Sequence, residues 1–149
     1  MTHEEKAVRY FTDGANCAQA VVLAYADDLG MDESTAKKLA SSFGGGIGRL
    51  REVCGAVSGM MMVYGLLRGY DDLRDPEAKK AHYQNVQALA GRFREANGSI
   101  VCRELLELRK GENSDPSPTP RDAQFFHSRS CAGFVQSAVR ILDEALKGE

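Results

Sequence analysis

The segment from Phe43 to Gly69 constrains the fold of this chain most strongly, because it joins a glycine-rich bend to a cysteine and a long apolar run. The bend leads through Arg49 and Arg51 to Cys54. The residues after Cys54 are first small and then apolar, which is typical of a helix buried on all sides. Small side chains also allow another element or a ligand to approach closely. The segment therefore predicts a central buried helix with room for something beside Cys54.

The length and charge of the chain limit its class. At 149 residues, we expect a single domain over residues 1–149. A chain of this size buries about 70% of the surface that its unfolded form exposes, so it needs no disulfide to fold. Its 19 basic and 21 acidic residues form no long block of one sign, which argues against a nucleic-acid surface. The expected partner is a small molecule, a metal or another protein.

The N-terminal sequence MTHEEKAVRYF lacks the basic start and the apolar core of a signal peptide. The apolar run Met60–Leu67 is shorter than the roughly 20 residues that span a bilayer. We therefore expect a cytoplasmic protein with no membrane insertion. In that reducing compartment, four cysteines indicate metal binding or redox activity rather than structural disulfides.

Apolar residues at helical spacing recur along the chain, and no alternating segment predicts a strand. We expect an all-α bundle of about five to seven helices. The predicted helices are His3–Thr12, one from Cys17 to Gly30 capped by Asn16, one capped by Asp32 or Ser34, the central helix after Cys54, Pro76–Asn97, a short one capped by Ser99, and one starting at Ser128 or Ser130.

Residues 110–124 have a different composition, with three prolines among Gly, Asn, Ser and Asp. This composition predicts an extended, exposed loop. Too little chain follows it to build a second core, so we interpret it as a loop of the same domain and as a candidate lid.

The predicted boundaries place every cysteine in the first turn of a helix, on the apolar side. A helix N-terminus carries partial positive charge, which favours a thiolate, and basic neighbours add to that effect. If these helix starts converge, they form a pocket suited to thiolates or to a thiolate-ligated cluster. For any single cysteine, simple burial as a small apolar residue is the alternative. The cysteines are Cys17, Cys54, Cys102 and Cys131, and the basic neighbours are Arg49, Arg51, Arg103 and Arg129.

Several familiar sites are not predicted. The sequence contains no CxxC or CxxCH, so it matches neither a zinc ribbon, a thioredoxin-type pair nor a covalent haem site. The glycines at 44, 46 and 48 follow a helix rather than a strand, unlike a dinucleotide-binding loop. We interpret His82 as a core histidine and the three methionines Met60–Met62 as packing, and we keep His127 as a weaker candidate because it lies near Cys131.

The hexapeptide Cys54-Gly55-Ala56-Val57-Ser58-Gly59, with one cysteine before it and two after it, resembles a known family. This is the family of small redox-active proteins named for the pattern C_GCAxxG_C_C, and the resemblance spans nearly the whole chain. It implies redox-active or metal-binding cysteines without naming a reaction. A similar cysteine module accompanies the haem domains of split-Soret cytochromes, where an iron-sulfur centre is associated with it. The resemblance therefore also raises the option of an iron-sulfur cofactor.

Our leading hypothesis is a redox protein whose four cysteines bind an iron-sulfur cluster or another thiolate-ligated metal, for electron transfer or redox sensing. The metal ligands would be Cys17, Cys54, Cys102 and Cys131, and the cofactor-contacting residues would be Gly55, Ala56 and Gly59.

Two alternatives remain open. The first is metal-free thiol chemistry with Cys54 as the redox-active attacking thiolate and another cysteine as the resolving one. The second is a non-catalytic accessory module for a transporter or an oxidoreductase, in which the cysteines fill the core. The expected partner is accordingly a redox protein or a transporter-associated protein, and the apolar face of Met60–Leu67 could instead form a homodimer interface.

Overall fold

The computed structural model describes residues 1–108, 113–122 and 131–148. In these residues the only strand-like pairing is an isolated antiparallel bridge between Val53 and Val101. The prediction of an all-α fold is confirmed. The helices are α1 His3–Thr12, α2 Cys17–Ala24, α3 Ala26–Leu29, α4 Glu33–Ala40, the 3₁₀ turn η1 Ser41–Phe43, α5 Gly55–Arg68, α6 Pro76–Asn97, α7 Cys102–Leu105 and α9 Cys131–Lys147.

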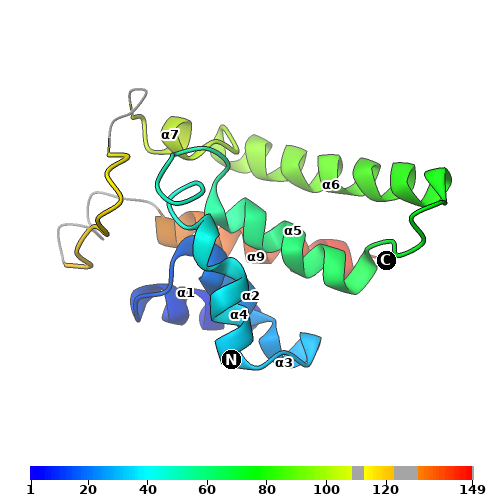
Figure 1. Cartoon of the computed structure of the whole chain (residues 1–149), viewed down its shortest axis with the longest axis horizontal. Coiled ribbons are helices and arrows are strands. Elements are labelled where there is room, and N and C mark those ends of the chain that lie inside the picture. The colour runs from blue at the N-terminus through cyan, green and yellow to red at the C-terminus, as the bar shows by residue number, and fades with distance from the viewer. Residues whose placement is uncertain (109–112, 123–130, 149) are drawn as a thin grey trace.

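The core forms around α2 and α5. In Figure 1, α6 runs along one side of α5, and the blue and cyan helices α1 to α4 gather on the other. Helix α2 is apolar on almost every side, and it contacts α1, α4, α5 and α9. Its approach to α5 depends on Gly59, because a Cβ atom there would lie 2.8 Å from the carbonyl oxygen of Ala18. Gly59 of the CGAxxG hexapeptide therefore packs one helix against another.

Local signals set several helix ends where the sequence predicted them. The Asn16 side chain accepts a hydrogen bond from the backbone NH of Gln19, and the Gln19 side chain accepts one from the backbone NH of Asn16. This capping box fixes the start of α2. Asp32 and Asp75 cap α4 and α6 through the same kind of bond, and Pro76 occupies the first position of α6.

The helix predicted from Cys17 to Gly30 is divided in two at Tyr25. The Tyr25 hydroxyl donates to the Asp143 carboxylate on α9 at 2.5 Å, and its ring stacks on His3 with the ring centres 4.0 Å apart. These contacts come from distant parts of the chain, and no local sequence signal encodes them.

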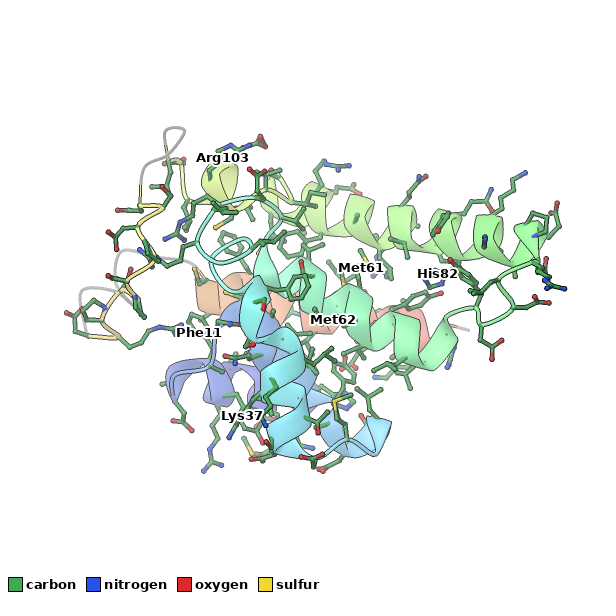
Figure 2. All side chains as sticks on the ribbon, viewed as in Figure 1. Phe11, Lys37, Met61, Met62, His82 and Arg103 are labelled. Atoms are coloured by element: carbon green, nitrogen blue, oxygen red, sulfur yellow. The ribbon has the colours of Figure 1, made fainter. Side chains whose placement is uncertain are left out.

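Helix α5 is less buried than the sequence predicted. Met60 and Val63 are fully buried, whereas Met61 and Met62 are half-buried and Leu66 is 57% exposed. Figure 2 shows Met61 and Met62 on α5, away from the cysteine end of the helix. No helix in the described part of the chain is both long enough and apolar enough to cross a membrane.

Two other predicted features either differ from the structure or fall on residues that it does not describe. Ser99 does not cap α7 directly, because Val101 is the N-cap; the Ser99 hydroxyl accepts from the backbone NH of Val101 and donates to Glu104. Ser128 and Ser130, like residues 110–112 and 123–124 of the predicted loop, lie outside the described residues. Residues 113–122 contain no regular helix or strand and are mostly exposed.

Candidate redox site

A cavity of about 530 Å³ lies where the first residues of α2, α5, α7 and α9 meet. All four cysteines line it, and this volume is in the range that holds a small molecule or a cofactor. The structure therefore brings together residues that are far apart in the sequence. They are Cys17, Cys54, Cys102 and Cys131.

Three of the cysteines sit at the beginning of a helix, and the fourth is the first described residue of one. Cys17 is the first residue of α2, Cys54 is the N-cap of α5, Cys102 is the first residue of α7, and α9 is described from Cys131. Two backbone hydrogen bonds fix the segments of Cys54 and Cys102 beside each other. The NH of Cys54 donates to the carbonyl of Ile100 at 2.8 Å, and the NH of Cys102 donates to the carbonyl of Glu52 at 2.6 Å.

The four side chains are thiols, and those of Cys17 and Cys54 hold their protons strongly. A hydrogen bond with Cys131 is the main cause that raises the pKa of Cys17 well above its ordinary value, followed by burial and by the charges of the other cysteines. Burial raises the pKa of Cys54 to about 12, although the backbone NH groups of Ala56 and Val57 act in the opposite direction. At Cys54 desolvation therefore outweighs the helix start that favours a thiolate.

This pKa predicts how Cys54 reacts with an alkylating reagent. Only the thiolate reacts, and its fraction rises about tenfold per pH unit below the pKa. In the native metal-free protein, we expect the rate of Cys54 alkylation by iodoacetamide to keep rising from pH 7 through pH 9, as peptide mass spectrometry would show. In urea, where the chain is unfolded, the rate should level off once the pH exceeds the ordinary cysteine pKa of 9.0. A native rate that levels off below pH 9 would contradict this prediction.

The glycine bend before Cys54 follows a left-handed path. Non-glycine residues in this conformation cost about 1–2 kcal/mol each, so the bend stores strain next to the cavity. Gly46 also has to lack a side chain, because a Cβ atom there would lie 2.8 Å from the Cβ atom of Cys102. The residues with positive φ are Gly45, Gly46, Ile47, Gly48, Arg49 and Arg51.

Residues 113–122, which we call the strap, are fastened to this bend by two arginines. Arg49 donates from Nε to the carbonyl of Asp115 at 2.6 Å and from Nη1 to the Thr119 hydroxyl at 2.9 Å. Arg51 donates from Nε to the carbonyl of Asn113 at 3.0 Å and from Nη1 to the Cys102 sulfur at 3.7 Å. The strap therefore forms one wall of the cavity.

The other end of the strap is held by Arg121. Its guanidinium lies 4.3 Å from the centre of the Phe11 ring and donates to the carbonyls of Phe11 and Ala15. Figure 2 shows Phe11 on the side of α1 that faces the strap. Sequence reasoning missed Arg121 and the role of Phe11 in the cavity, because a lone arginine in a proline-rich segment gives no signal of its contact with α1.

Of the other predicted site residues, one lines the cavity and the rest lie away from it or outside the described residues. Gly55 lines the cavity. Ala56 is fully buried and Gly59 packs closely against α2, and neither of them lines the cavity. Arg103 lies on the outer side of α7, where it pairs with Glu52 at 3.3 Å. Arg129 and His127 lie outside the described residues.

His82 lies apart from the cysteines, on α6. Its ring is half-buried and stacks on Tyr64 with the ring centres 5.7 Å apart. His82 is therefore not the core histidine that the sequence predicted, because its ring is only half-buried and its Nδ1 atom is buried without a hydrogen-bond partner in the described residues.

Residues 15–145 match the family described as "Putative redox-active protein (C_GCAxxG_C_C)". The chain belongs to this family. Membership confirms the resemblance drawn from the CGAxxG hexapeptide and supports a cysteine-based redox role, without specifying a metal or a reaction. No curated protein and no solved structure matches the chain significantly.

The cysteine arrangement suits some cofactors better than others. In the described residues, no three His, Cys, Asp or Glu side chains form a group that could hold a single metal ion. A tetrathiolate zinc site has Zn–S bonds of about 2.3 Å, so its sulfurs must nearly touch one another. An iron-sulfur cluster instead places iron and sulfide between its thiolate ligands, and the cavity provides that space. The four thiols that line the cavity are thus of the ligand type that a cluster uses, while no three ligands in the described residues are grouped to hold a metal ion.

Proposed function

We propose that this protein transfers electrons in the cytoplasm through an iron-sulfur cluster held in the four-cysteine cavity. The ligands would be Cys17, Cys54, Cys102 and Cys131. The observation that supports this proposal is the convergence of four thiols on one cavity that also contains the buried guanidinium of Arg51. Such a cluster, when bound, accepts and releases single electrons.

The residues around the cavity suit this role. The raised pKa values of Cys17 and Cys54 keep these thiols protonated in the metal-free protein, so loading of the site must release protons. The positive charge of Arg51 offsets the negative charge of thiolates. Its hydrogen bond to Cys102 would raise the reduction potential of a centre ligated by that sulfur.

Anaerobic reconstitution with ferrous iron and sulfide tests the proposal. We expect the wild-type protein to gain visible absorption and to retain iron and sulfide in stoichiometric amounts after desalting. The control is a variant in which the four cysteines are replaced by alanine and serine, which should stay colourless under the same conditions. A wild-type protein that remains colourless and metal-free, with four titratable thiols, would refute the proposed cofactor.

One contact favours a second candidate, which is metal-free thiol and disulfide chemistry. The hydrogen bond between Cys17 and Cys131 places these thiols next to each other. Their oxidation would form one S–S bond and release two electrons and two protons to an oxidant such as glutathione disulfide. The high pKa of Cys54 argues against an attacking role for this residue in the metal-free protein.

Peptide mass spectrometry after treatment with glutathione disulfide separates the candidates. A reversible Cys17–Cys131 disulfide in a protein that binds no iron would support the second candidate. If neither a disulfide nor a cluster forms, the interpretation as a non-catalytic accessory module is the one that remains.

A further inference from the structure

Arg51 has an unusual environment for a charged side chain. It is only 4% exposed, it lines the cavity, and its Nη2 atom has no hydrogen-bond partner in the described residues. The adjacent carboxylate, Glu52, pairs with Arg103 instead. Burying an unpaired charge costs several kcal/mol, and a hydrogen-bonding group left without a partner adds to that penalty. Packing of the strap alone does not explain this arrangement, because Nε already provides the bond to Asn113.

We propose that Arg51 anchors a small oxyanion in the cavity, beside the cysteines. Its Nε atom is engaged with Asn113 and one Nη1 hydrogen with Cys102. The donors that remain are those of Nη2 and the second hydrogen of Nη1. These donors form the flat edge of the guanidinium, which matches the two oxygens of a carboxylate, a phosphate or a similar group.

The charges around the cavity agree with an anionic ligand. Arg49 and Arg121 line it together with Arg51, and none of the described lining residues is acidic. Basic groups in a concave, poorly hydrated site concentrate anions there. The volume of about 530 Å³ also exceeds that of a simple inorganic oxyanion, which leaves room for a small organic acid.

This inference goes beyond the proposed electron transfer, because anion binding to Arg51 does not require a cluster. It would place a small oxyanion next to the redox-active sulfurs, which is where a reducible or oxidisable substrate has to lie. Inorganic oxyanions and organic carboxylates both match the free edge of the Arg51 guanidinium, and separate probes distinguish these two classes of ligand.

Isothermal titration of the full-length protein tests the inference, with iron and sulfide assayed on the same sample. The probes are inorganic phosphate and acetate, each added at constant ionic strength in sodium chloride. We expect saturable binding of at least one probe, and the probe that binds identifies the source. Loss of the charge-assisted bonds in Arg51→Met should weaken the binding of that probe about tenfold or more. The control Arg74→Gln removes an exposed arginine that does not line the cavity, and it should leave the affinity unchanged.

A second measurement uses only the wild-type protein, so the test stands even if Arg51→Met fails to fold. The bound anion should slow the alkylation of Cys102, which is hydrogen-bonded to Arg51, relative to the same ionic strength of chloride. The absence of both saturable binding and protection in the wild type would overturn the inference, as would an unchanged affinity in folded Arg51→Met. The iron assay is independent of these outcomes, so failure of the cluster proposal is recognised separately.

Discussion

A Gly59→Ala variant is expected to lose about 2 kcal/mol or more of unfolding free energy, within the range found for overpacked cores. The added Cβ atom would lie 2.8 Å from the carbonyl oxygen of Ala18 and 2.9 Å from the Cβ atom of Val21. Both atoms belong to α2, which is fixed on its other sides by α1, α4 and α9. The clash can therefore be relieved only by moving α2 away from α5.

The same helix provides a matched control. A Cβ atom at Gly65 would meet nothing within 4 Å, so Gly65→Ala should stabilise the protein by about 0.5–1 kcal/mol through helix propensity. Urea denaturation followed by circular dichroism measures both changes. If the two variants shifted the midpoint in the same direction, the close packing of α2 on α5 at Gly59 would be wrong.

Gly46→Ala should have a second large effect, about 3 kcal/mol, because it combines a left-handed residue with a steric clash. Gly46 has a φ of +71°, and its added Cβ atom would lie 2.7 Å from the backbone nitrogen of Glu52 and 2.8 Å from the Cβ atom of Cys102. The clash would push Cys102 away from its present position, so the variant should also retain less iron after reconstitution.

Gly48→Ala is the control for this prediction. Gly48 also has a positive φ, at +54°, but a Cβ atom there would meet nothing within 4 Å. We expect a loss of about 1 kcal/mol, from backbone strain alone, and unchanged iron binding. Denaturation curves and iron assays on both variants check the difference. Equal stability and equal iron content in the two variants would contradict the contact between the bend and Cys102.

The helices were predictable from the sequence because their signals are local. The capping box of Asn16 and Gln19 and the Asp75-Pro76 start of α6 each lie within a few residues of the helix that they begin. The position of Cys17 at a helix start followed from the same capping box. Convergence of those helix starts was a hypothesis, since nothing in the sequence specifies which helices meet.

The chemistry of the site was harder to predict, because burial and long-range contacts determine it. The sequence suggested that the helix start and nearby arginines favour a thiolate at Cys54, whereas burial in the folded protein raises its pKa to about 12. Arg51 was recognised only as a cation near Cys54. Its bonds to Cys102 and Asn113 join residues that are 51 and 62 positions apart, and no spacing rule connects such residues.

The central claim is that the four cysteines act as one site, and a series of single Cys→Ser variants tests it most directly. Each variant is reconstituted anaerobically with iron and sulfide beside the wild type, and bound iron per chain is measured. Our account predicts that the wild type retains a cluster and that every replacement, at Cys17, Cys54, Cys102 or Cys131, lowers the bound iron. A wild type without iron, or a replacement that retains the full wild-type amount, would contradict it.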